Sequence, residues 1–180
     1  MAEAVRLGIN RYTLYSMRNE GSIVQIARGV YRLKSMPIEN EPDIVTVCSR
    51  FPQAVIFLIS ALYFHKITTQ IPYEVYIAVP TDVRIKLPDY PPIRSHRISR
   101  ETYIAGIEEL VIDGVKVKIY DPEKTLVDCF RFRNKVGLDV ALEALKFYRK
   151  RGKMNLTKIS KYAKLCRVEK IMQPYLEAVI

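Results

Sequence analysis

The sequence lacks the features that mark membrane and secreted proteins. Its longest apolar run, Ala54–Phe64, has eleven residues and is too short to span a bilayer. Residues 1–10 contain neither the basic region, nor the long apolar stretch, nor the cleavage site of a signal peptide. The three cysteines show no CxxC spacing, which indicates reduced, buried thiols rather than a disulfide framework. We therefore expect a cytoplasmic protein with no membrane contact.

Signatures of common catalytic sites are also missing. The seven glycines form no phosphate-binding loop and no GxGxxG motif. The two histidines, His65 and His96, lie far apart in the sequence and neither belongs to an HExxH motif, which argues against a zinc site. Ser60 and His65 lie five residues apart and could form a nucleophile pair, although a packed helix end is the simpler interpretation. The sequence thus predicts no metal, no cofactor and no enzyme.

What the sequence does contain is an excess of positive charge. Its 180 residues include 29 lysines and arginines against 19 acids, a net charge of +10, and 49% hydrophobic residues exclude a disordered chain. Residues 1–34 carry +4, residues 35–125 carry −2 and residues 126–180 carry +8. Two basic ends therefore flank a slightly acidic middle. This charge indicates a polyanionic partner, nucleic acid first and an acidic protein second.

The first 34 residues have the pattern of the back half of a winged helix-turn-helix. Residues 2–7 favour a helix, and Asn10 is a suitable N-cap for a second helix that ends near residue 20. Residues 22–26 and 30–33 are β-rich, and the three-residue link with a glycine between them predicts a hairpin, the wing. A winged helix puts its recognition helix in the major groove and binds phosphates at the helix start and the wing. The DNA-binding candidates are therefore Asn10, Arg11, Tyr12, Tyr15, Ser16, Arg18 and, at the wing tip, Arg28.

The rest of the chain predicts a mixture of helices and strands. Residues 54–65 are apolar nearly all round and predict a buried helix. Asp113-Gly114 lies between two β-rich runs and predicts a tight hairpin. Asp121-Pro122-Glu123 is a strong helix start. Further elements are expected as a helix near 44–48, strands at 73–79, 93–98, 109–112 and 115–120, and helices at 121–134, 138–151, 156–167 and from 168 onward, where Pro174 breaks or kinks the last helix.

The predicted fold class is α+β. A winged helix-turn-helix at 1–34 is followed by a polar, proline-containing linker at 35–42 and a C-terminal domain at 43–180. That domain is expected to consist of a mixed α/β part at 43–120 and a helical bundle at 121–180.

Acids and lysines recur at 113–124 and leave an enzymatic alternative open. A metal-dependent nuclease needs carboxylates to hold the ion and a lysine to polarise the phosphate. Asp113, Lys116, Lys118, Asp121 and Glu123 supply these groups, and strand alternation puts both lysines on one face. A solvent-facing strand followed by a helix cap explains the same residues more simply.

Several segments resemble the AbiEi family of antitoxins. The similarity begins with GINRYTLYSMRNEGSIVQIARGVYRL (8–33) and continues in IPYEVYIAVP (71–80), YPPIR (90–94) and CRVEKIMQPYLEAVI (166–180). The most specific stretch is IDGVKVKIYDPEKTLVDCFRFRNKVGLDVALEAL (112–145). The resemblance implies a prokaryotic, non-enzymatic regulator from a type IV toxin–antitoxin pair linked to abortive infection of phage.

The resemblance also implies partners and a division of labour. The winged helix would repress its own operon on double-stranded operator DNA, as a dimer on an inverted repeat, and would lack the first helix that family members usually carry. The C-terminal domain would neutralise an AbiEii-type nucleotidyltransferase toxin. We expect the basic surface for this activity to comprise Arg131, Arg133, Lys135, Arg149, Lys150, Arg151 and Lys153. A protein-interaction module that does not bind DNA is a further alternative.

Overall fold

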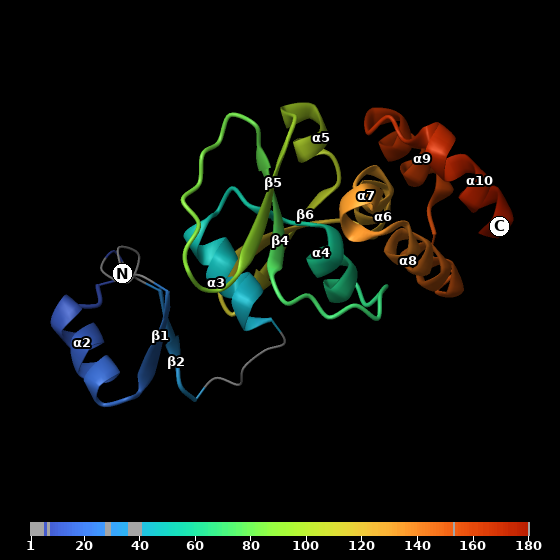
Figure 1. The fold of residues 1–180 in the computed structure, drawn as a ribbon. Helices are drawn as coiled ribbons and strands as arrows, with labels where there is room; N and C mark the ends of the chain where they lie inside the picture. The colour runs from blue at the N-terminus through green and yellow to red at the C-terminus, as the bar shows by residue number, and fades with distance from the viewer. Residues whose placement is uncertain (1–5, 7, 28–29, 36–40, 153, 180) are drawn as a thin grey trace.

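The computed structural model describes residues 6, 8–27, 30–35, 41–152 and 154–179 (Figure 1). The helices are α2 (Arg11–Asn19), α3 (Pro42–Arg50), α4 (Leu58–Phe64), α5 (Arg100–Ile104), α6 (Pro122–Arg131), α7 (Arg133–Val136), α8 (Leu138–Lys150), α9 (Leu156–Leu165) and α10 (Glu169–Val179). The strands are β1 (Ile23–Ala27), β2 (Val30–Leu33), β3 (Val55–Ile56), β4 (Val75–Pro80), β5 (Ile93–Ile98), β6 (Ile107–Ile112) and β7 (Val115–Tyr120).

The strands form two separate sheets. β1 and β2 make an antiparallel pair, while the larger sheet has the order β5-β4-β3-β7-β6. In the larger sheet β4 pairs parallel with β5, β3 pairs parallel with β7, and the other pairs are antiparallel. β5 and β6 are therefore the two edge strands.

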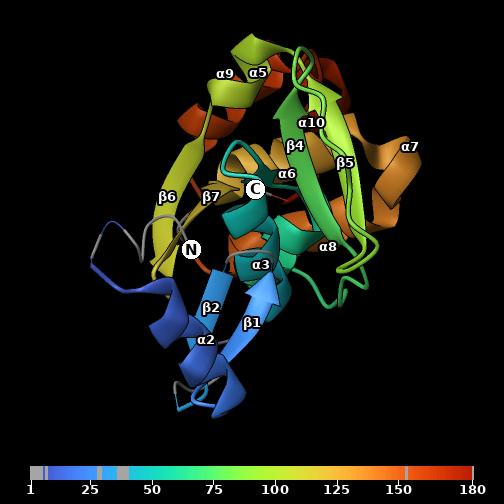
Figure 2. The same ribbon diagram turned by 90° about the vertical axis from the view of Figure 1, so that its left-hand side faces the viewer.

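Helices cover both faces of the larger sheet (Figures 1 and 2). On one face α3 packs with Ile56, Ile77 and Ile119. On the other face α4, α6 and the C-terminal helices share one continuous core that extends from Val55 to Met172. The two predicted parts of the C-terminal domain, 43–120 and 121–180, therefore contribute to the same core. Among the described residues, no helix combines the length and the apolar character needed to cross a membrane.

The N-terminal module, the described residues up to 35, lies beside this body. α2 contacts β1, with Leu14 of α2 and Ile23 of β1 both buried, and β1 in turn contacts α3. The predicted helix at 10–20 and the predicted hairpin strands are confirmed as α2, β1 and β2. The helix expected at 2–7 and the hairpin tip at Arg28 lie outside the described residues.

Several local predictions in the C-terminal part are confirmed because short-range chemistry determines them. The hairpin β6–β7 turns at Asp113-Gly114, where both residues have a positive φ. Asp121 caps α6, since its Oδ1 accepts a hydrogen bond from the backbone N–H of Lys124 at 2.7 Å. The strands expected at 73–79 and 93–98 correspond to β4 and β5.

The continuous buried helix predicted at 54–65 is wrong. Residues 55–56 form the central strand β3, the chain turns at Leu58 with a φ of 45°, and α4 begins there. The strand β3 is fully buried and α4 is buried over most of its surface, so together they produce one apolar run without a helical period. Such a run does not distinguish a central strand from a buried helix.

Helix ends account for the remaining differences. The helix expected at 121–134 ends at Arg131, and the separate short helix α7 follows it. Of the break or kink expected at Pro174, the break does not occur, since α10 continues through this residue. The short helix α5, which follows Ser99, has no counterpart among the predicted elements.

Candidate functional site

The exposed face of α2 carries most of the predicted DNA-binding residues. Leu14 points to the hairpin, whereas Arg11, Tyr12 and Tyr15 are exposed, Tyr12 to 79%. The Asn10 side-chain oxygen accepts a hydrogen bond from the Tyr12 backbone N–H at 3.1 Å and so caps the helix. The Asn10 amide group therefore has a structural role as well as any role in DNA contact.

Two further side chains on α2 are partly engaged. The Arg18 guanidinium lies over the Tyr15 ring, 5.2 Å from its centroid. Ser16 donates a hydrogen bond to Glu20 at 2.5 Å. Arg11, Tyr15 and Arg18 follow one another at helical spacing and form an exposed cationic and aromatic stripe. Arg28 lies outside the described residues, so its place beside this stripe is untested.

The predicted C-terminal basic surface divides into two groups. Arg131, Arg133 and Lys135 lie at the junction of α6 and α7, whereas Arg149 to Arg151 lie at the other end of α8. α8 has 13 residues, so about 20 Å separates the two groups along its axis. Lys153 lies outside the described residues. These cations do not form one compact cluster.

Some of these cations hold the fold rather than face solvent freely. Arg133 donates a hydrogen bond to the Phe130 carbonyl at 3.0 Å, at the end of α6. Arg151 donates one to the Lys66 carbonyl at 2.5 Å, which ties the end of α8 to the end of α4. Lys135 is exposed, and its Nζ lies 5.7 Å from the centroid of the Phe132 ring.

Two carboxylates of the nuclease alternative, Asp121 and Glu123, belong to a buried polar network at the start of α6. Asp121 Oδ2 accepts a hydrogen bond from the Tyr162 hydroxyl at 2.9 Å and lies 3.3 Å from Lys158 Nζ. Glu123 accepts a hydrogen bond from the Tyr148 hydroxyl at 2.7 Å. Burial, together with these acceptors, raises the pKa of both tyrosines, so both hydroxyls stay protonated and act as donors. The network joins α6 to α8 and α9.

The proposed metal ligands are not brought together. Asp113 lies at the hairpin turn and Asp121 at the opposite end of the six-residue strand β7, which puts them roughly 20 Å apart. Lys124 is fully buried and pairs with Asp128 within α6. Among the described residues, no group of three or more His, Cys, Asp or Glu side chains is placed to hold a metal ion.

Ser60 and His65 do not form a nucleophile pair. The Ser60 hydroxyl donates to the Glu74 carbonyl at 3.4 Å and accepts from the Tyr76 backbone N–H at 3.0 Å, which fixes α4 against β4. His65 Nε2 lies 2.7 Å from the Tyr120 carbonyl, and burial lowers the pKa of its imidazole. The simpler interpretation, a packed helix end, agrees with these contacts.

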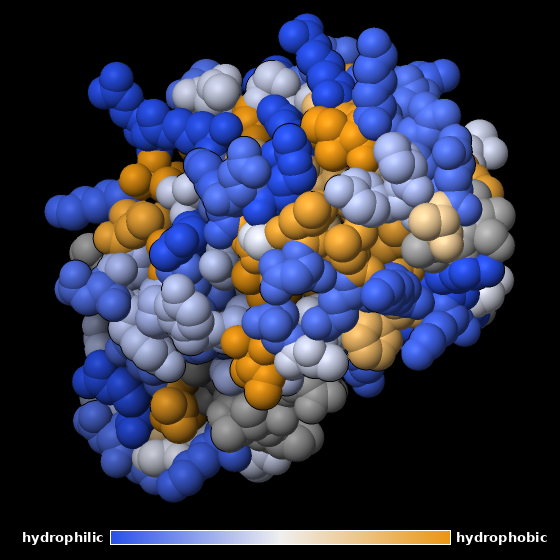
Figure 3. Space-filling view, turned by 45° about the vertical axis from the view of Figure 1, so that its right-hand side comes forward, coloured by the Kyte–Doolittle hydropathy of each residue, from blue (hydrophilic) through white to orange (hydrophobic). Residues whose placement is uncertain are grey.

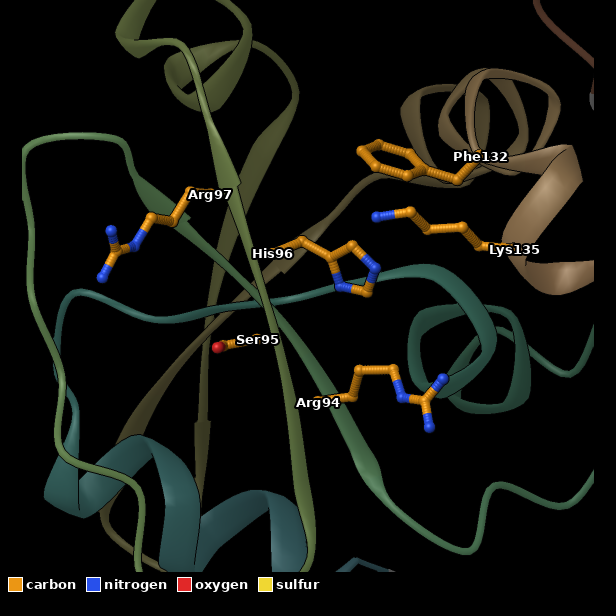
Figure 4. Close-up of a pocket in the computed structure, with 6 residues that line it drawn as sticks. All are labelled: Arg94, Ser95, His96, Arg97, Phe132 and Lys135. Atoms are coloured by element: carbon orange, nitrogen blue, oxygen red, sulfur yellow. The ribbon is translucent and has the colours of Figure 1, made fainter.

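A basic pocket at the edge strand β5 was not predicted from the sequence. It has a volume of about 470 Å³ and is lined by Arg94, Ser95, His96, Arg97, Phe132 and Lys135 (Figure 4). Burial lowers the pKa of His96, and the Lys135 ammonium lowers it further. The strand pattern Arg94-x-His96 was a usable signal, since it puts both side chains on one face. Lys135 comes from α7, 39 positions after His96, and no local pattern indicates that it joins them.

Comparison with known families locates one similarity at the N-terminus. Residues 1–34 match a family model described as a transcriptional regulator, AbiEi antitoxin. The segment contains α2 and the β1–β2 hairpin, so the resemblance found in the sequence is confirmed there. The comparison with curated proteins found no match to the chain.

Proposed function

We propose that this protein is an antitoxin-type transcriptional regulator that represses its own operon. The observation that carries the proposal is the match of residues 1–34 to the regulator family. The exposed stripe of Arg11, Tyr15 and Arg18 on α2 supports it, because cationic and aromatic groups on one helix face suit a DNA groove and its phosphates. In this proposal α2 is the recognition helix and the β1–β2 hairpin is the wing.

The repressor part is tested by fluorescence anisotropy with a duplex that carries the region upstream of the gene. The parent protein should bind this duplex more tightly than a scrambled one, and affinity should fall steeply with salt because phosphate contacts release counterions. The variant Arg11→Ala/Arg18→Ala should weaken binding. Lys170→Ala on α10 is the matched control, since it also removes an exposed cation. Absence of any sequence preference at low salt would refute the repressor proposal.

The second part of the proposal is that residues 43–180 counteract a nucleotidyltransferase toxin encoded beside the regulator. The segregation of cations supports it, since residues 126–180 carry +8 away from α2. In co-expression with the neighbouring gene, Arg149→Ala/Lys150→Ala should reduce rescue of growth, while Arg11→Ala/Arg18→Ala should retain it. Loss of rescue by the α2 variant alone would contradict the assignment.

A protein-interaction role without DNA binding is a second candidate. Apolar side chains reach the surface on the side of the C-terminal helices, bordered by hydrophilic ones (Figure 3). Leu138, Leu142, Ile171 and Leu176 of α8 and α10 are only partly buried where they pack against the larger core. Apolar areas rimmed by polar residues are typical of protein contacts. Rescue of growth from the toxin, without any specific binding of operator DNA, would favour this candidate.

A further inference from the structure

The basic pocket on β5 is built around a buried imidazole. His96 is only 7% exposed, and its Nδ1 is buried without a hydrogen-bond partner among the described residues. The ring is held by edge contacts with Phe57 and Phe132, whose centroids lie 5.5 and 5.1 Å away. It projects into the space between Arg94 and Lys135 (Figure 4). The edge of the ring that lines the pocket is the part of His96 that a ligand there can contact.

The Arg94 side chain also lines this pocket, and two neighbouring side chains hold it there. Its Nε forms an ion pair with Glu74 Oε1 at 2.6 Å, and its guanidinium lies over the Tyr76 ring, 5.8 Å from the centroid. Among the described residues, these contacts engage Nε and the face of the guanidinium, and none engages its two terminal nitrogens. The two terminal nitrogens retain their N–H donors, the groups that bind a phosphate or carboxylate in bidentate fashion.

Lys135 is the second cation that lies beside the His96 ring (Figure 4). The Lys135 ammonium lies over the face of the Phe132 ring. It has no acidic partner among the described residues. Arg97 is exposed on the opposite face of β5, beside Ser95 (Figure 4). Glu74, the carboxylate near His96 in the described part of the chain, is already paired with Arg94. The pocket therefore has a surplus of positive charge.

We propose that this pocket binds the terminal phosphate of a small, nucleotide-sized phosphate monoester. Its volume lies within the range of small-molecule sites, and Phe132 provides an apolar wall for the organic part of the ligand. A terminal phosphate can reach the buried imidazole. A duplex phosphate is esterified on both sides and stays on the outside of a convex helix, so it cannot enter to the same depth.

The two histidines of the chain provide a direct readout. In long-range ¹H–¹⁵N spectra of the full-length protein, adenosine 5′-monophosphate should shift the His96 imidazole signals. It should also raise the pKa of His96, because a nearby anion favours the charged ring. The His65 signals should stay in place, since that ring contacts the Tyr120 carbonyl elsewhere. His96→Gln removes one set of signals and so assigns them.

Matched ligands and variants make the test decisive. Inorganic phosphate should shift His96 and adenosine should not. Lys135→Gln should weaken binding of the monophosphate about tenfold, the loss of one charge-assisted contact, whereas Lys116→Gln, exposed on β7, should leave it unchanged. Unchanged His65 signals show that each variant is folded. An unmoved His96 signal, an equal effect of adenosine, or a response to duplex DNA alone would each overturn the proposal.

Discussion

Lys124 and Asp128 form an ion pair within α6, and both side chains are fully buried. Asp128 also accepts from the Cys166 thiol across 3.8 Å, and Lys124 Nζ lies 4.4 Å from the centroid of the Tyr120 ring. The pair thus sits where α6 meets both the sheet and the segment after α9. The substitution Lys124→Met keeps a chain of similar length but leaves the carboxylate without its cation.

The expected loss follows from this burial. Removal of one partner of a buried ion pair costs about 3–5 kcal/mol, because an uncompensated charge remains in the core. Burial raises the pKa of Asp128, and Lys124 is the largest influence that opposes this rise. In the variant, Asp128 therefore binds a proton over a wider pH range. Between the unfolded and the raised folded pKa the native state holds the extra proton, so its stability falls as pH increases, by at most about 1.4 kcal/mol per pH unit.

Urea unfolding followed by circular dichroism at pH 5, 6 and 7.5 measures both effects. Lys124→Met should lower the free energy of unfolding most at pH 7.5 and least at pH 5. The double variant Lys124→Met/Asp128→Leu should regain most of the loss, since no charge remains buried. Lys170→Met, an exposed position, is the control. The reasoning would be refuted if Lys124→Met lowered the free energy of unfolding by less than about 1 kcal/mol and left its dependence on pH as in the parent protein.

Three other expectations concern DNA binding, packing and thiol reactivity. Arg11→Ala should reduce the slope of log K against log salt by about 1 if this residue contacts a phosphate, and an unchanged slope would exclude that contact. Gly106→Ala should destabilise more than Gly152→Ala in urea unfolding, although both positions have a positive φ, because a Cβ at 106 would meet the Lys124 side chain at 2.7 Å. Equal losses would show that only backbone strain matters. Ellman's reagent at pH 8 should label none of the three buried thiols before unfolding, since burial raises the pKa of Cys48 to about 12; rapid labelling of the native protein would contradict this.

The parts of the fold that short-range chemistry determines were predictable from the sequence. Asn10 and Asp121 predict the starts of helices, and Asp113-Gly114 predicts the hairpin. Each of these residues acts on backbone groups only a few positions away. The central strand β3 was not predictable in this way. It is two residues long and buried by partners on β4 and β7, which lie more than 20 positions away in the sequence.

The candidate sites also differ in whether neighbouring residues or long-range packing create them. The face of α2 could be derived from helical periodicity, and the burial of Leu14 opposite an exposed Tyr12 agrees with it. The pocket on β5 could not be derived from the sequence, because Lys135 joins Arg94 and His96 only through the packing of the chain. The sequence also indicated one basic surface between residues 131 and 153. In the structure, α8 separates the described cations of this surface into two groups, one at each end of the helix.

The thin core of the N-terminal module has a consequence for how operator DNA would be sensed. Among the module's side chains whose burial is described, only Leu14 and Ile23 are buried, and this small buried area contributes little hydrophobic stabilisation. A ligand that binds only the folded form adds RT ln(1 + [L]/Kd) to its stability, which is about 2.7 kcal/mol at a hundredfold excess over Kd. For a module this small such an increment is a large share of the total. Operator DNA would therefore slow amide hydrogen exchange in α2 and the hairpin while leaving exchange in β4 and α6 unchanged, so the module would gain much of its order from the duplex it reads.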